Sequence, residues 1–600
     1  MTLTDRHLDE LKLERLQSFE ADKLRYAALL RTDPAALGPL TQRAMQFHDT
    51  LTLCAVAEGL SGAGDFGRTV LRRLGLNGVL LDAAIQERCY DTALKVFGSV
   101  PPETWQAAKA WQAAAVAFAA TAKLEQAREA AERALKLDPE VRGARELLAL
   151  LSARRELKAR AEEGDDVSWG DLRRLLELYL ALEMKAYASR LLQRRVQALP
   201  KPRPEDYEDG LETMKAALPL LGPEFVLRHA QPLAAVAADD RLKALFVQCL
   251  IALGRPEDGA EADEGGRDLR LQRALALAAT GRTADAVHRL GRHTIKRRRD
   301  LEVRAALGFH VGRQVLEEEP LVLRSPGGER RIFNLMPFND EIEVLKIHLA
   351  EMWDWVDLFV IAEAEVTFTG QPKPLHFERH KAEFAQYADK IRHVVVRQHP
   401  PIINSPWSRD FRQRDLAATA ISGLAAPDDL VLLTDVDEIV DGRALEGFDG
   451  DMACLRMAMF RFFLNYRPDA HHFPQRPTGA VVKAKFLQRF GSSYLRFELA
   501  RSKRGLQVNQ AGWHFTSVCD PARLVAKVNS YAHQERGIEW RDVDHVDRLL
   551  SQIKAGVFEP GWERAEIDDS FPAAIVQRQE ELRDLLISAA PEQPAPSASA

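Results

Sequence analysis

The chain has 600 residues, of which 46% are hydrophobic and 28% charged, which is the composition of an ordinary globular protein. At roughly 150 residues per domain it has room for three or four domain equivalents. Its formal net charge of −6 gives no reason to expect nucleic-acid or anionic-membrane binding. No apolar run approaches the roughly 20 residues of a membrane helix. Because the first ten residues are mixed in charge and the five cysteines are scattered, we expect reduced thiols and a cytoplasmic location.

Residues 1–300 are rich in Ala, Leu, Arg and Glu, with apolar residues every three or four positions, which is typical of successive amphipathic helices. The clearest unit resembles a tetratricopeptide repeat at Trp111, Ala114, Ala115, Phe118, Ala127, Ala131, Ala134 and Pro139. Ala93 lies one 34-residue period before Ala127. A second unit fits at Leu172, Leu175, Tyr179, Ala188, Leu192 and Pro200, and inter-helix turns are indicated at Leu253-Gly254-Arg255 and Thr280-Gly281-Arg282. We expect an all-α tetratricopeptide-like solenoid whose groove holds a peptide or partner protein, or alternatively a structural spacer or dimerisation arm.

The helical pattern breaks between residues 301 and 330, at Glu317-Glu318-Glu319-Pro320 and at Ser325-Pro326-Gly327-Gly328, and we expect a linker there. Beyond it the pattern alternates between strands, at 331–335, 356–361, 391–396 and 430–434, and helices, at 341–352 and 411–424. Such alternation predicts an α/β domain with parallel strands, which we place at 331–560. A closing helix is indicated at 571–588, and residues 589–600 have the composition of a disordered tail.

One stretch of this second half joins an apolar run to a cluster of acidic residues. Four apolar residues, Leu430 to Leu433, lead through Thr434 into Asp435, Asp437 and Glu438. A short apolar run bounded by turn signals is typical of a buried strand, and open α/β sheets bind ligands at the carboxyl ends of their strands. Two carboxylates at positions i and i+2 can both turn toward Mg²⁺ or Mn²⁺. The alternative is that they cap a turn at the end of the strand.

Several further motifs carry a family resemblance. Met336-Pro337-Phe338-Asn339-Asp340-Glu341, Thr367-Phe368-Thr369-Gly370, Lys373-Pro374-Leu375, Gln413-Arg414, Thr434 to Glu438, Gly512-Trp513-His514-Phe515 and His533-Gln534-Glu535 follow one another along the chain. Their order resembles that of glycosyltransferase family 17 over about residues 331–540. The resemblance implies a GT-A type, Rossmann-like fold. It also implies an inverting transfer of a sugar, typically N-acetylglucosamine, from a UDP-sugar.

The resemblance assigns roles to particular residues. Asp435, Asp437 and His514 would hold Mn²⁺ or Mg²⁺, although His514 is alternatively a packed histidine. Glu438 would orient these ligands or accept sugar hydroxyls.

We expect the nucleotide sugar to be bound by Asp435, Phe338, Asn339 and Arg414. Phe338 would stack on uracil or belong to the core, and Arg414 would pair with the diphosphate or form a helix-surface ion pair. The candidate general bases are Glu363, Glu498 and Glu535, among which the sequence does not choose.

The sequence therefore predicts a metal-dependent glycosyltransferase whose helical repeats recruit a protein or glycan acceptor. Repeats joined to a transferase resemble bacterial protein glycosyltransferases, including those that modify flagellin. One alternative is a phosphohydrolase of the haloacid dehalogenase class, with Asp435 as nucleophile and Asp437 as acid and base, although Glu438 and Ile439 continue that motif poorly. Another is a non-catalytic scaffold with a decayed transferase domain.

Overall fold

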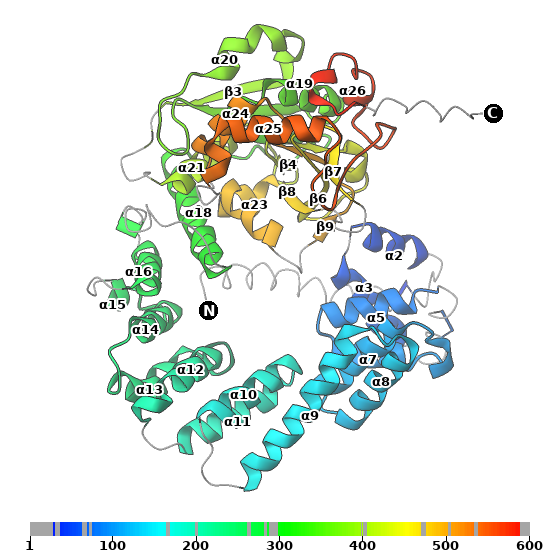
Figure 1. The fold of residues 1–600 in the computed structure, drawn as a ribbon, viewed down its shortest axis with the longest axis vertical. Coiled ribbons are helices and arrows are strands. Elements are labelled where there is room, and N and C mark those ends of the chain that lie inside the picture. Colours follow the sequence, from blue (N-terminus) through cyan, green and yellow to red (C-terminus); the bar gives the residue numbers. More distant parts are fainter. Residues whose placement is uncertain are drawn as a thin grey trace, which may run out of the picture. The chain divides into compact units, whose positions relative to one another are not determined.

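The computed structural model of the chain divides into two compact units, residues 1–281 and residues 282–600 (Figure 1). The first is built of helices and the second of a β-sheet with helices, so the predicted order of a helical region followed by an α/β domain is confirmed. The structure describes residues 28–29, 37–47, 49–62, 69–70, 75–163, 169–198, 202–260, 266–280, 282, 285–286, 298–397, 399, 405–469, 476–501, 506–532 and 538–588.

The helices of the first unit follow one another with short connections. They are α2 (Leu37–Gln46), α3 (Thr50–Gly62), α5 (Asn77–Gln86), α6 (Tyr90–Phe97), α7 (Ala108–Ala120), α8 (Leu124–Leu137), α9 (Arg142–Glu163), α10 (Trp169–Ala181), α11 (Lys185–Ala198), α12 (Tyr207–Leu221), α13 (Pro223–Ala234), α14 (Asp240–Ala252), α15 (Glu257–Ala260) and α16 (Arg267–Ala279). The predicted small positions of α7 and α8, namely Ala114, Ala115, Ala127, Ala131 and Ala134, are fully buried. Small side chains let these two helices approach closely. Pro200 and Gly281 lie outside the described residues.

Four helices of this unit end in the same turn. A residue with positive φ follows the helix at Arg88 (59°), Ala122 (62°), Glu183 (57°) and Gly254 (73°). At the second of these, Lys123 N–H donates to Phe118 O at 2.8 Å and Ala122 N–H donates to Ala119 O at 2.9 Å. These paired bonds define the Schellman motif, which satisfies carbonyls that a helix end leaves free. Arg88 and Ala122 are one 34-residue period apart, as the predicted repeat requires.

The second unit contains a large mixed sheet. Its strands are β1 (Ile332–Phe338), β2 (Leu358–Ala364), β3 (Ile391–Val396), β4 (Leu430–Leu433), β5 (Glu438–Val440), β6 (Met452–Arg461), β8 (Arg476–Lys483), β9 (Leu506–Val508) and β10 (Gly512–Thr516), in the order β3-β2-β1-β4-β8-β6-β10-β5 with β9 beside β6. Neighbours among β1 to β4 are parallel, as predicted, whereas β8 is antiparallel to both β4 and β6. A separate pair joins β7 (Tyr466–Pro468) to β11 (Trp562–Arg564).

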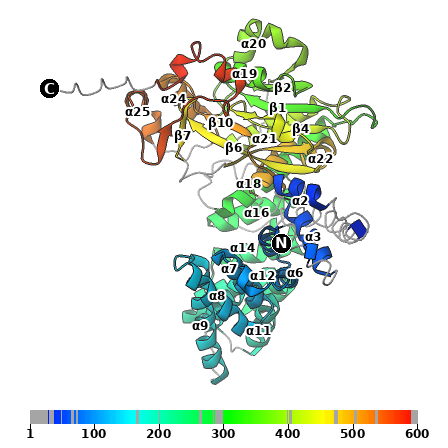
Figure 2. The same ribbon diagram turned by 90° about the vertical axis from the view of Figure 1, so that its right-hand side faces the viewer.

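Helices cover both faces of the sheet (Figure 2). The helices that the structure describes in this unit are α18 (Arg298–Glu318), α19 (Ile342–Met352), α20 (His376–His380), α21 (Pro406–Thr419), α22 (Ala484–Phe490), α23 (Ser492–Arg501), α24 (Pro521–Ser530), α25 (Val543–Lys554) and α26 (Ala573–Val576). Successive residues of β1 show the two faces: Asn334 contacts His348 of α19, while Leu335 lies beside α21 and α23. The sheet is therefore buried on both sides, which explains its continuous apolar strands.

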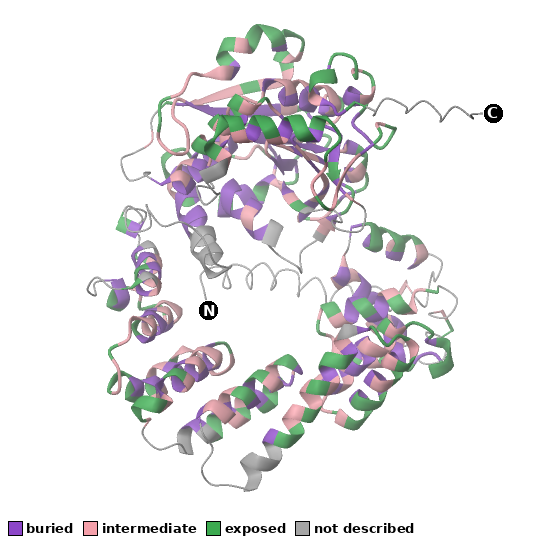
Figure 3. Cartoon of the chain, viewed as in Figure 1, coloured by how far each residue is buried: buried purple, intermediate pink, exposed green. Residues whose placement is uncertain are grey.

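Helix α18 occupies most of the segment in which the sequence predicts a linker. It packs against α21, α22 and α23, and residues 307–312 are buried (Figure 3). Phe309 contacts Tyr494 of α23 edge to face, with ring centroids 5.5 Å apart. The helical periodicity of α18 resembles that of the first half of the chain, so its sequence does not reveal that it belongs to the second unit.

Two predicted helices have different bounds in the structure. Helix α21 begins at Pro406 because Ser405 caps it, accepting a hydrogen bond from the N–H of Ser408, and it ends at Thr419. Residues 571–588 form the short helix α26 and a 3₁₀ turn at Arg583–Leu585. In the part of the chain that the structure describes, no helix is long and apolar enough to cross a bilayer.

We predict that Ala122→Gly stabilises the first unit by about 0.5–1 kcal/mol, because glycine adopts a positive φ without the cost that a Cβ imposes. The melting temperature, followed by circular dichroism, should rise by about 1–3 °C. As a control, Ala117→Gly in the buried interior of α7 should lower it. A decrease with both variants would contradict the strain assigned to this turn.

Candidate active site

The acidic motif lies in the loop of residues 434–437 between β4 and β5. Because β4 runs parallel to β1, this loop emerges at the carboxyl edge of the parallel strands, where ligands bind in open α/β sheets. Strand β5 pairs with β10, and this pairing sets His514 opposite Glu438. The sheet thus brings His514 to the motif from a distant part of the sequence.

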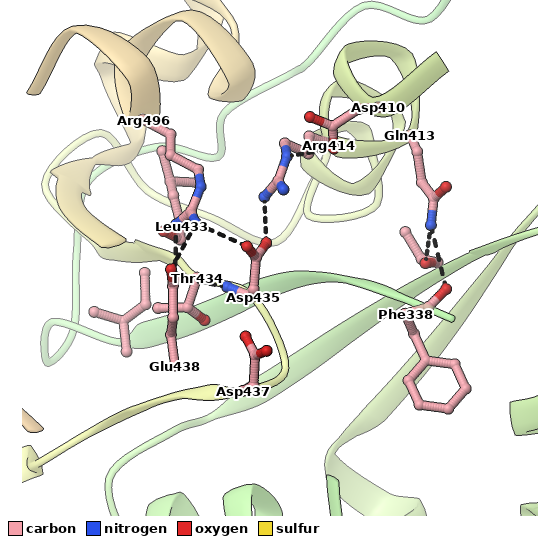
Figure 4. A network of polar contacts seen from close by, with 12 residues as sticks. Phe338, Asp410, Gln413, Arg414, Leu433, Thr434, Asp435, Asp437, Glu438 and Arg496 are labelled. Atoms are coloured by element: carbon pink, nitrogen blue, oxygen red, sulfur yellow. Dashed lines mark hydrogen bonds and ion pairs between the residues drawn. The ribbon is translucent and has the colours of Figure 1, made fainter. Parts of the chain in front are cut away.

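Two arginines from different helices hold Asp435 (Figure 4). Its carboxylate lies 2.7 Å from Arg414 Nη1 of α21 and 3.0 Å from Arg496 Nη2 of α23. Arg496 also donates to both oxygens of Glu438 at 2.8 Å, and Glu438 accepts the N–H of Asp435 at 2.8 Å. Burial alone would raise the pKa of Asp435, but the two guanidinium groups hold that pKa far below its ordinary value. Glu438, which is buried, thus links the backbone of Asp435 to Arg496.

Asp437 lies among different partners. Its carboxylate is 3.2 Å from Lys527 Nζ of α24 and 3.6 Å from His514 Nε2 of β10. Burial raises the pKa of Asp437 in spite of these two partners. Among the described residues, the buried Nδ1 of His514 has no hydrogen-bond partner. The same residues contain no ready group of three His, Cys, Asp or Glu side chains at metal-binding distance. Asp437 and His514 thus contact each other, whereas Asp435 is held by the two arginines.

A buried polar network supports the loop from the α19 side of the sheet. His348 Nδ1 lies 2.9 Å from the carbonyl of Val436, and its Nε2 lies 2.7 Å from the side-chain amide of Asn334. That amide is in turn 2.8 Å from the hydroxyl of Thr434. Burial lowers the pKa of His348 to about 4, so the imidazole is neutral at pH 7. The atom of Asn334 that faces Nε2 is Oδ1, an acceptor, while Nδ2 of the same amide donates to the Thr434 hydroxyl.

A cavity of about 500 Å³ opens beside the loop. The acidic residues that line the cavity are Glu341, Asp410, Asp435 and Asp437. The basic residues that line it are Lys373, Arg414, Arg461, Arg496 and Lys527. The predicted residues Phe338, Asn339 and His514 also line it. Phe338 is only 2% exposed and meets Phe377 edge to face, so most of its ring belongs to the core. The sequence pattern does not single out Lys527 or Arg496, because each lies on a helix far along the chain from the motif, nor Asp410, which precedes Arg414 by one turn of α21.

The structure does not favour Glu363 as the general base. Glu363 is fully buried and does not line the cavity. It accepts hydrogen bonds from Lys373 Nζ at 3.3 Å, from the N–H of Phe377 at 3.2 Å and from the N–H of His376, and His393 Nε2 lies 3.2 Å from it. A base must reach the acceptor hydroxyl, and these contacts place Glu363 as an anchor for the loop that carries Lys373.

The other two candidate bases differ in position. Glu498 is buried on α23 and does not line the cavity. Glu535 lies outside the described residues, three positions after Ala532, which does line it.

Comparisons with known proteins match the part of the chain that contains this site. Residues 323–557 match the family model described as Glycosyltransferase family 17. The human protein named Beta-1,4-mannosyl-glycoprotein 4-beta-N-acetylglucosaminyltransferase is 30% identical over 202 residues, which are 31% of this chain and 36% of that protein. Rat and mouse proteins of the same name are 31% and 30% identical over 116 residues, which are 18% of this chain and 22% of theirs. The chain thus spans about a third or less of the length of these relatives. The matches confirm the family resemblance for residues 323–557 and place that part of the chain in the class of the glycosyltransferases.

One solved structure, "Structure of Naa15/Naa10 bound to HypK-THB", is 15% identical and covers 48% of this chain and 47% of that chain. Its TM-score of 0.19 is too low to support a statement about the fold.

We predict that the neutral state of His348 makes the second unit sensitive to acid. Its pKa of about 4 in the folded protein lies below the value of about 6.5 for an unfolded histidine, so the unfolded state binds more protons between these values. The free energy of unfolding should therefore fall as pH drops from about 6.5 to 4, by up to about 3 kcal/mol. Urea unfolding of His348→Gln should show a smaller fall over this range, whereas His545→Gln on α25 should behave like the wild type. An equal acid sensitivity in both variants would contradict the assignment.

We predict that Glu363→Gln lowers the free energy of unfolding at pH 7 by about 2–4 kcal/mol, because Lys373 then keeps its buried charge without a carboxylate partner. Denaturant unfolding measures this loss. Glu365→Gln is the matched control, because that neighbouring carboxylate is 40% exposed and pairs with Arg397 at the surface. Unchanged stability together with abolished sugar transfer would restore Glu363 as the base.

Proposed function

We propose that the protein is a metal-dependent, inverting glycosyltransferase that moves N-acetylglucosamine from a UDP-sugar to a protein or glycan acceptor. The observation that carries the proposal is the cavity at the carboxyl end of β4, where Asp435, Asp437, His514 and Arg414 share one lining inside the family-matched segment. The relatives' names supply the sugar. The parallel order β3-β2-β1-β4 supports a GT-A type fold.

The charge balance of the described lining supports a divalent cation. Three of its five cations are also paired with carboxylates outside the lining: Lys373 with Glu363, Arg461 with Glu559 and Arg496 with Glu438. Arg496 is shared between Glu438 and Asp435, so the five cations face the four lining carboxylates and these three further carboxylates. The excess negative charge, the oxygen donors and the unpartnered Nδ1 of His514 suit Mn²⁺ or Mg²⁺.

Asp435, Asp437 and His514 would hold the cation, which would neutralise the charge that develops on the leaving diphosphate. Arg414 is held in place by Asp410, 2.9 Å from its Nε, and its fork of donors suits phosphate oxygens. Asn339, at the end of β1, would contact the nucleoside. We assign the general base to Glu535, because the segment just before it lines the cavity whereas Glu363 and Glu498 do not.

For the helical unit we propose a tetratricopeptide-like solenoid that recruits the acceptor or a partner that carries it. The repeated Schellman turns and the 34-residue spacing of two of them support a repeat architecture.

The first test is the melting temperature of the full-length protein with Mn²⁺ and a panel of nucleotide sugars. A ligand that binds only the folded state stabilises it by about 3 kcal/mol at roughly 100 times its dissociation constant. We expect a metal-dependent shift with UDP-N-acetylglucosamine. No shift with any nucleotide sugar would contradict the proposal, and metal-dependent release of phosphate from simple esters would favour the phosphohydrolase.

We predict that Asp435→Asn and Asp437→Asn each abolish that shift and lower sugar transfer on the order of 10²–10³-fold, because each removes a charge directed at the cation. Transfer is measured by release of UDP. Asp428→Asn is the matched control, because this exposed aspartate precedes β4 at its opposite end and pairs with surface lysines. Full transfer by either motif variant would contradict the assignment.

A further inference from the structure

Lys527, like Arg461 and Arg496, is a cation of the cavity lining that lies outside the family motifs. It lies on α24, its side chain is 19% exposed, and its Nζ is 3.2 Å from both Asp437 Oδ2 and Glu341 Oε1. Glu341 is itself fixed, since it accepts the backbone N–H groups of Asn339 at 3.2 Å and Asp340 at 3.1 Å. Lys527 therefore joins the motif to the segment that follows β1.

The ion pairs of Lys527 differ in kind from those of most other cations in the lining. Lys373, Arg461 and Arg496 each have a carboxylate partner outside the cavity lining, which holds them whatever binds there. Both carboxylates that contact Lys527 line the cavity themselves. The burial of Lys527 would lower its pKa, but Asp437 and Glu341 outweigh that effect, so its pKa is raised and the amine is charged.

We propose that Lys527 is an exchangeable counter-ion of the acidic motif: it neutralises Asp437 in the empty site, gives up Asp437 to a divalent cation, and then binds the diphosphate of the donor. This inference rests on the proposed function. Glu341 keeps the amine at the cavity throughout.

The physical reason is competition for one carboxylate. An ammonium group and a divalent cation on the same carboxylate repel each other strongly in a partly buried site, so binding of the metal ion displaces Lys527 from Asp437. The displaced amine then keeps Glu341 as its partner but has lost Asp437, and a diphosphate replaces the lost carboxylate. The metal ion and the diphosphate should therefore bind more tightly together than separately, and this coupling is reciprocal.

The test is calorimetric titration of full-length Lys527→Met, first with Mn²⁺ alone and then with UDP at saturating Mn²⁺. Removing the competitor should tighten Mn²⁺ binding about tenfold, while removing the phosphate partner should weaken UDP binding about tenfold, as expected for one charge-assisted contact. A residue with only a structural role would not move the two affinities in opposite directions.

The matched control is Lys346→Met. Lys346 also bridges two carboxylates, Glu343 and Glu383, and is 23% exposed, but it does not line the cavity, so both affinities should stay at wild-type values. Lys527→Gln provides a second variant if the methionine variant unfolds, and the same opposite changes are expected.

A loss of both affinities, or no change in either, would overturn the role of Lys527 while wild-type UDP binding leaves the proposed function standing. Absence of UDP binding by the wild-type protein would overturn the proposed function itself.

Discussion

The candidate site depends on the burial of Arg496. Its guanidinium group donates to Glu438, to Asp435 and to the carbonyl of Leu433 at the end of β4. A buried charge is tolerated only when it is paired and hydrogen-bonded, and here the partners are the residues on both sides of the loop. One helix of the second half of the domain thus fixes where strand β4 ends and how Asp435 is presented. Asp437, two residues further on, takes no part in these ion pairs and contacts Lys527 and His514 instead.

The opposite face of the sheet imposes a second constraint on the same loop. The side-chain hydroxyl of Thr434 contacts Asn334, and the backbone carbonyl of Val436 contacts the neutral His348 of α19. The loop therefore has two kinds of polar group. The carboxylates of Asp435 and Asp437 line the cavity, while the Thr434 hydroxyl and the Val436 carbonyl belong to a buried network. Satisfying every group of such a network selects one loop geometry, because any other would leave a buried donor or acceptor unpaired.

Part of the fold and part of the candidate site can be predicted from the sequence. The strand Leu430–Leu433 and the acidic residues after it follow from composition and turn signals, and the parallel order of β1 to β4 follows from the alternation of elements. The period of the apolar residues and the composition could not reveal that α18 packs on the second unit, because an amphipathic pattern does not show which element its apolar face will contact. They also could not reveal Lys527 or Arg496, which reach the motif only through tertiary packing. Glu363 was a reasonable base by residue type, but only the fold shows that its oxygens are occupied.

The cavity lining combines two groups of residues that are supported in different ways. Asn339 follows β1, and Lys373 and Arg414 are held by the buried carboxylates of Glu363 and Asp410. Arg461, Ser517 and Trp562 form the second group and lie near strand ends and connections that are far apart in the sequence. Trp562 is held between Tyr466, with ring centroids 5.1 Å apart, and the guanidinium of Arg461, 4.1 Å from its ring. Under the proposed function, the first group would hold the nucleotide sugar, so a change in the second group would alter contacts to the acceptor without removing contacts to the donor.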